Sequence, residues 1–155
     1  MHLKQQSHSA VMPPVSSILR TLLGLAFVVF GLNYFFNFLP QPGPPPQRAI
    51  EFIVPFIGAK YMGLIKTIEI ASGVALLANR FVPLALALLA PILVGITWFH
   101  AMLEPSGLPV PVVLVALELA LAWFYRDAFA PMLRARTSPA ARAAEPRVER
   151  GTVAA

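Results

Sequence analysis

Hydrophobic residues fall into four long runs, which polar or proline-containing segments separate. The runs cover residues 17–39, 61–78, 81–103 and 109–125. About 20 residues of α-helix cross a bilayer, so each run predicts a membrane-spanning helix. The turn at residues 79–80 is so short that it forces the second and third helices to run antiparallel. The pattern therefore predicts an all-α integral membrane protein, a four-helix bundle.

The connection between the first and second runs has a different pattern. Residues 40–46 carry five of the 16 prolines, which predicts an extended, non-helical stretch. Residues 49–58 follow, with apolar side chains at i, i+1, i+4 and i+5 counted from Phe52. Ten residues of helix cover only about 15 Å, too little to cross a bilayer. We expect a short interfacial helix here, broken from the second span by Pro55 and Gly58.

Composition agrees with a membrane protein. The chain is 57% hydrophobic and 12% charged, whereas soluble domains average about 45–50% and about 25%. The net charge of +5 suggests nucleic acid at first sight, but five of the 12 Lys and Arg residues fall in the last 22 positions. The sequence contains no dense basic run with interleaved aromatic residues, so a nucleic-acid partner is not expected.

Charge also predicts orientation through the positive-inside rule. With four spans, both termini share one side with most of the basic residues, namely Lys4, Arg20, Arg80, Arg126, Arg134 and Arg136. The opposite loops offer only Arg48 and Lys60, offset by Glu51 and Glu104. Both termini are therefore predicted to be cytoplasmic. The chain divides into a polar N-terminal segment (1–16), a four-span domain (17–133) and a disordered basic tail (134–155).

Three ionisable residues fall inside predicted spans, Lys66 and Glu69 in the second and Glu118 in the fourth. A lone charge near mid-bilayer costs about 2.5–3.5 kcal/mol on insertion scales, so Lys66 is expected to pair with Glu69 across one helical turn. Glu118 has no nearby base in its own helix. Either Lys66 reaches it from the second span or it is held protonated. The three residues form a candidate intramembrane polar site, and a purely structural ion pair is the competing interpretation.

A second candidate group is an outer vestibule formed by Asn33, Asn37 and His100, near the outer ends of the first and third spans. For His100 the alternative is an interfacial residue whose ring reaches headgroup water. The chain has no cysteine, and His2 and His8 lie outside the spans. Thiolate chemistry is thereby excluded, and neither a metal site nor a haem ligand pair is expected.

Two runs resemble the DoxX family of small four-helix membrane proteins over about residues 17–133. The first is Leu19-Arg20-Thr21-Leu22-Leu23-Gly24-Leu25 with Gly31-Leu32-Asn33. The second is Glu69-Ile70-Ala71-Ser72-Gly73-Val74-Ala75-Leu76-Leu77, followed by Arg80-Phe81-Val82-Pro83-Leu84-Ala85. This resemblance implies a multi-pass protein of a bacterial-type inner membrane, associated with quinol oxidase or thiosulfate–quinone systems.

The resemblance assigns no activity by itself, and the chain has no flavin or nicotinamide motif. Our first hypothesis is an accessory or ligand-binding subunit of a membrane redox or stress-response complex. In this hypothesis the protein has no catalysis of its own, and a quinone is the candidate ligand. A second hypothesis is a small proton-coupled carrier that works as a homo-oligomer through Glu69 and Glu118. The third is a structural interaction protein whose polar residues only specify helix pairing.

Overall fold

The computed structural model describes residues 14–40 and 43–135. Its elements are α1 (Pro14–Phe36), α2 (Gln47–Gly58), α3 (Tyr61–Leu77), α4 (Val82–Met102), η1 (Pro105–Gly107), α5 (Pro109–Phe124), α6 (Arg126–Phe129) and η2 (Ala130–Leu133). All regular structure in the described residues is helical, which confirms the all-α prediction. Most of the predicted N-terminal segment and nearly all of the predicted basic tail lie outside the described residues.

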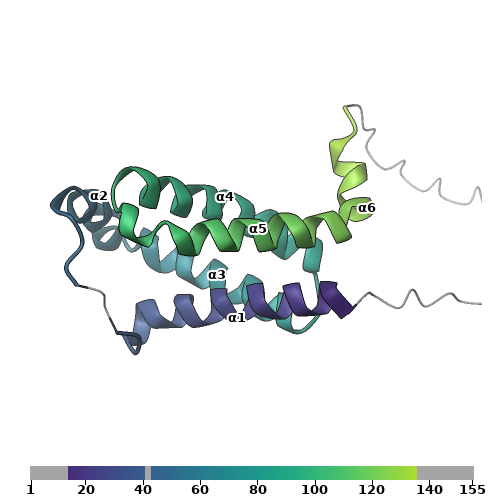
Figure 1. Cartoon of the computed structure of the whole chain (residues 1–155), viewed down its shortest axis with the longest axis horizontal. Helices are drawn as coiled ribbons and strands as arrows, with labels where there is room; N and C mark the ends of the chain where they lie inside the picture. The colour runs from purple at the N-terminus through teal and green to yellow at the C-terminus, as the bar shows by residue number, and fades with distance from the viewer. Residues whose placement is uncertain (1–13, 41–42, 136–155) are drawn as a thin grey trace, which may run out of the picture.

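Four helices, α1, α3, α4 and α5, lie side by side and form what we call the bundle (Figure 1). Each packs against two others, so that α1 contacts α3 and α5, while α4 contacts the same two helices. Neighbouring helices run in opposite directions. The α2 end of the bundle holds the start of α3 and α5, and the α6 end holds the start of α1 (Figure 1).

The observed helix ends differ from the predicted spans by up to three residues. The largest difference is in α1, which begins at Pro14 and ends at Phe36 instead of Leu39. Asn37 explains this end, because its backbone takes the left-handed conformation (φ 49°) and its N–H bonds the Asn33 carbonyl at 2.8 Å. A left-handed residue after the last turn is a common way to end a helix, and asparagine tolerates it.

The short second helix is separate from α3, as predicted. Lys60 takes the left-handed conformation (φ 58°) between the two, so they do not merge into one straight helix. The break does not fall at Pro55, which lies inside α2 one turn before its end. Phe52 places its ring 5.9 Å from that of Phe99, and Arg48 Nε donates to the Leu103 carbonyl at 3.1 Å. These contacts hold α2 against the end of α4.

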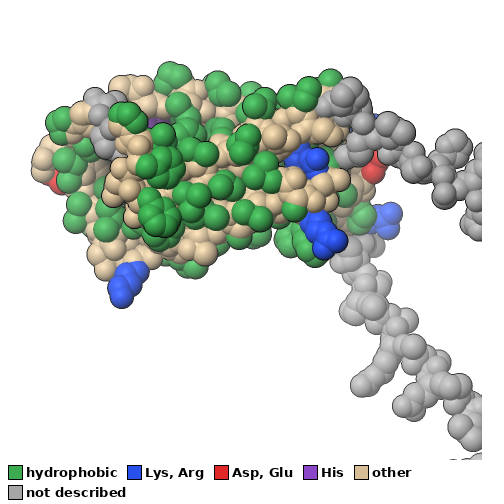
Figure 2. All heavy atoms as spheres, turned by 90° about the horizontal axis from the view of Figure 1, so that it is seen from below, with side chains coloured by type: hydrophobic (Ala, Val, Ile, Leu, Met, Phe, Trp, Pro, Cys, Tyr) green, Lys and Arg blue, Asp and Glu red, His purple; other side chains and the backbone are tan. Residues whose placement is uncertain are grey.

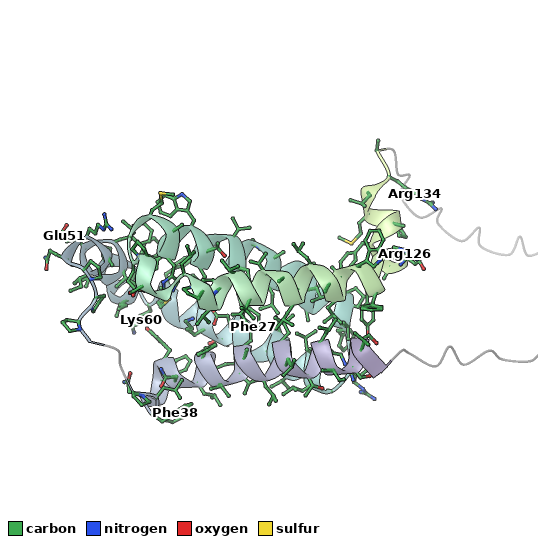
Figure 3. The ribbon with its side chains drawn as sticks, viewed as in Figure 1. Phe27, Phe38, Glu51, Lys60, Arg126 and Arg134 are labelled. Atoms are coloured by element: carbon green, nitrogen blue, oxygen red, sulfur yellow. The ribbon has the colours of Figure 1, made fainter. Side chains whose placement is uncertain are left out.

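Large aliphatic and aromatic side chains fill the interior of the bundle. The most buried are Leu23, Phe27, Leu76, Leu86, Leu89, Leu93 and Leu121. Figure 3 labels Phe27, which lies within the bundle above α1. The outside is also apolar: large hydrophobic residues are exposed on every helix of the bundle. Figure 2 shows them along the length of one face, with Lys and Arg side chains near the two ends.

Two helices are long and apolar enough to cross a membrane, Val15–Phe36 and Val82–Met102. Helices α3 and α5 are shorter, with 17 and 16 residues. By length and composition, then, two of the four predicted spans meet the criterion for a membrane helix.

Helices α1 and α3 make a close backbone contact at a pair of glycines. A Cβ built on Gly24 would lie 2.9 Å from the Gly73 carbonyl oxygen, and one built on Gly73 would lie 2.8 Å from that of Gly24. Small residues at such a crossing allow backbones to pack directly, as is common between membrane helices. Glu69 and Ser72 are buried on α3 together with Gly73.

Candidate functional site

The polar face of α3 carries the first part of the site. Glu69, Ser72, Gly73 and Leu76 are its buried residues, at three- and four-residue steps along one face. Lys66 Nζ donates to both carboxylate oxygens of Glu69, at 2.9 Å each. The Glu69 side chain is 1% exposed and that of Lys66 is 18% exposed. The predicted Lys66–Glu69 pair is therefore formed, with its acid inside the bundle and its amine near the surface.

Glu118 supplies the second part, from α5. It shares a buried stripe with Pro111, Leu114 and Leu121, and it is 6% exposed. Its Oε1 atom is buried and has no hydrogen-bond partner among the described residues. An unpartnered buried oxygen costs about 1–3 kcal/mol, so this position is unfavourable unless a proton or another molecule satisfies it.

Of the two alternatives for Glu118, the ion pair with Lys66 is not formed among the described residues. Lys66 bonds Glu69 instead. Two features explain this. Helices α3 and α5 each pack against α1 and α4, which separates them in the bundle. A bond across one turn of the same helix also needs less ordering of the long lysine side chain than a bond to another helix.

The two acids nevertheless lie at the same level of the bundle. Helices α3 and α5 both begin at the α2 end (Figure 1). Glu69 lies about 12 Å and Glu118 about 13 Å from these starts, at 1.5 Å per residue. The interior thus holds one acid compensated by a lysine and one uncompensated acid at mid-length.

Ser72 is a polar group of the interior that sequence reasoning missed. It is 3% exposed, and its Oγ atom has no hydrogen-bond partner among the described residues. A hydroxyl in a helix usually bonds the carbonyl four residues earlier, as Thr67 and Thr97 do here. The signal was present in the sequence, since Ser72 follows Glu69 by one turn.

The three residues of the predicted vestibule lie near the α2 end, and the side chains of Asn33 and His100 bond within their own segments. Asn33 Oδ1 accepts a hydrogen bond from the Leu39 backbone at 2.7 Å, and the backbone of Asn37 ends α1. His100 Nδ1 lies 2.7 Å from Glu104 Oε2, in the turn that joins α4 to α5. Asn33 and His100 therefore stabilise the segments that follow the ends of α1 and α4.

The described residues contain no group of three or more His, Asp or Glu side chains placed to hold a metal ion. Glu69 and Glu118 are the only ionisable residues that are buried among the described residues of the bundle.

Comparison with known proteins adds no family. Searches of family models, of curated proteins and of solved structures found no match to this chain.

Proposed function

We propose that the chain is a DoxX-like, four-span membrane protein that acts as an accessory, ligand-binding subunit of a membrane redox or stress-response complex. In this proposal it binds a quinone and has no catalytic activity of its own. The observation that carries the proposal is the buried, unpartnered carboxyl oxygen of Glu118 inside an apolar bundle.

Membrane insertion is supported by the distribution of apolar and charged side chains. Soluble proteins rarely expose wide apolar surfaces, yet Leu25, Leu88 and Leu119 are exposed midway along their helices. The described charges outside the interior lie toward the two ends, as Arg126 and Arg134 do at one end and Glu51 at the other (Figure 3). Helices α3 and α5 are short spans of about 24–25 Å, a mismatch that local thinning of the bilayer accommodates.

We further propose the orientation that the positive-inside rule predicts, in a bacterial-type inner membrane with both termini cytoplasmic. The α6 end, with Arg20, Arg80, Arg126 and Arg134, then faces the cytoplasm. The α2 end faces outward, and α2 lies in the interface.

The chemistry of Glu118 suits a quinone headgroup. A neutral carboxylic acid donates a hydrogen bond to a quinone carbonyl, and a carboxylate accepts one from a quinol hydroxyl. The surrounding apolar bundle suits the hydrophobic remainder of such a molecule. Lys66 and Glu69 stay a closed ion pair at the same level, which leaves Glu118 as the hydrogen-bonding group.

The same geometry weakens the proton-coupled carrier. Both oxygens of Glu69 accept hydrogen bonds from Lys66, so exchange of a proton between Glu69 and Glu118 requires this pair to open first. A carrier would then have Glu118 as the one interior acid, among the described residues, that is not in an ion pair. The structural interpretation, in which the polar groups only specify helix pairing, predicts no ligand at all.

The test measures thermal unfolding of the detergent-purified chain with and without a water-soluble short-chain quinone. We expect the quinone to raise the unfolding temperature of the wild type, and Glu118→Leu to fold but lose this rise. Glu51→Leu makes the same chemical change on an exposed residue of α2 and should keep it. A rise that survives in Glu118→Leu, or no rise in the wild type, would contradict the proposal. The latter result favours the structural interpretation.

A further inference from the structure

A separate unsatisfied group lies near the α6 end of the bundle, on α1. Arg20 occupies the buried stripe of this helix, because Ser16, Leu23 and Phe27 lie at i−4, i+3 and i+7 and are at most 1% exposed. The Arg20 side chain therefore leaves the helix on the side that faces the bundle interior. Its Nη1 atom is buried and has no hydrogen-bond partner among the described residues.

Tyr125 presents a second unsatisfied group at the same end. It directly follows the last residue of α5, packs against the buried core, and has a buried hydroxyl without a partner among the described residues. Helices α1 and α5 are neighbours, and α1 begins where α5 ends (Figure 1). Two donor atoms, one of them charged, thus lie near one end of this helix pair without an acceptor among the described residues.

The charges around this end do not supply the missing acceptor. Arg80, Arg126 and Arg134 are exposed there, and Asp127 is the one acid among the described residues of α6 and η2. Figure 3 shows Arg126 and Arg134 at this end. Arg126 is already engaged: it donates to the Trp123 carbonyl at 3.3 Å and lies 5.3 Å from the centre of the Trp123 ring. The buried Nη1 atom of Arg20 has no such partner among the described residues, so a bound anion would satisfy it.

We propose that Arg20 and Tyr125 form a binding site for a phosphate group. A guanidinium binds phosphate with two parallel N–H···O bonds, and a phenol adds a third donor to a remaining oxygen. Partial burial strengthens these bonds, because a site of lower dielectric screens charge less than water does. The phosphate comes either from a lipid headgroup or from free phosphate. The lipid source rests on the proposed membrane function, since this end then lies among the cytoplasmic headgroups.

The test uses the full-length chain in mild detergent, stripped of lipid, with thermal unfolding as the readout. Three additives are titrated: phosphatidylglycerol, inorganic phosphate, and diacylglycerol, which has the same chains without the phosphate. We expect phosphatidylglycerol to raise the unfolding temperature and diacylglycerol not to. A rise with inorganic phosphate at millimolar concentration would identify free phosphate as the source. An equal rise with diacylglycerol would overturn the proposal, because the acyl chains alone would explain it.

Variants locate the site. Arg20→Gln should lose most of the phosphate-dependent rise, whereas Arg134→Gln, an exposed arginine at the same end, should keep it. Equal losses in both would indicate general attraction of charge and would overturn the site. Tyr125→Phe removes one hydroxyl only. We expect it to raise the additive concentration at the titration midpoint about fivefold, which corresponds to about 1 kcal/mol of binding free energy. If Arg20→Gln fails to fold, an unchanged midpoint in Tyr125→Phe refutes the proposal by itself.

The result is distinguishable from failure of the proposed function. A wild type that responds to phosphatidylglycerol but not to quinone would remove the quinone proposal and keep this site. A wild type that responds to quinone, with Arg20→Gln and Tyr125→Phe unchanged in their response to phosphatidylglycerol, would remove the phosphate site and keep the quinone proposal.

Discussion

Replacing Gly73 by alanine should destabilise the protein, although alanine is the better helix former. The new Cβ would lie 2.8 Å from the Gly24 carbonyl oxygen, about 0.6 Å short of the 3.4 Å at which ordinary contact begins. It would also meet Val28 Cγ2 at 2.9 Å and the Val28 backbone nitrogen at 3.1 Å. Two of the three obstacles are backbone atoms, which cannot rotate away, so α1 and α3 must separate along their contact.

The magnitude follows from two opposing terms. Overpacking of this kind costs about 1–3 kcal/mol, and the change from glycine to alanine inside a helix returns about 0.8–1.0 kcal/mol. Gly63 provides the matched control in the same helix, because a Cβ built there meets nothing within 4 Å. Gly63→Ala should therefore raise the free energy of unfolding. Gly73→Ala has the same gain in helix propensity, but overpacking also destabilises it. The two variants should differ by about 1–3 kcal/mol.

The assay is reversible unfolding of both variants in detergent by a denaturing surfactant, followed by circular dichroism at 222 nm, a wavelength for helix content. Equal stabilisation of the two variants would contradict the predicted overpacking, because it would mean that α1 and α3 do not meet at Gly24 and Gly73. A further check is Gly24→Ala, whose Cβ would lie 2.9 Å from the Gly73 carbonyl and should destabilise in the same way.

Two further predictions concern orientation and the interior acids. The chain contains no cysteine, so Gln47→Cys should react with an impermeant maleimide in intact cells, and Ser138→Cys only after permeabilisation. The reverse pattern would invert the proposed topology. Lys66→Met should cost up to about 3 kcal/mol by leaving the Glu69 carboxylate buried and unpaired, and replacing Lys66, Glu69 and Glu118 together by apolar residues should restore much of that loss in surfactant unfolding. A triple variant less stable than Lys66→Met would contradict the reading of Glu69 as a buried, lysine-compensated acid.

Local features of the fold could be predicted from the sequence. The Lys66–Glu69 pair depends only on three-residue spacing within one helix, and the structure contains it. Pro55 and Gly58 predicted that the short helix is separate from α3, and it is. The break itself occurs at Lys60, and Pro55 lies inside the short helix, one turn before its end. The end of α1 was misplaced by three residues, because apolar residues continue to Leu39 and the left-handed turn at Asn37 gives no signal in hydropathy.

Contacts between helices could not be predicted in the same way. The contact between Lys66 and Glu118, one of two alternatives for this acid, is not formed. Equal depth does not tell which helices are neighbours, and the order of helices in the bundle keeps α3 and α5 apart. Arg20 is the opposite case, since its spacing was visible in the sequence, but this residue was used only for the orientation and for the family resemblance. Its spacing to Ser16, Leu23 and Phe27 places it in the buried phase of α1. An arginine in that phase needs acceptors, and its buried Nη1 atom has none among the described residues.

The two unsatisfied groups differ in what can complete them, and their depth decides this. Arg20 and Tyr125 lie near the end of the bundle, where headgroup phosphates and solutes are within reach of a long side chain. Glu118 lies about 13 Å from the start of its helix, at a level where the proposed bilayer offers neither. Only a proton or a molecule that enters the apolar interior can satisfy its carboxyl oxygen there. The proposed partners therefore differ: we propose an anion from the membrane surface for the permanent charge at the end, and a hydrophobic molecule with a polar head for the uncompensated acid at mid-length.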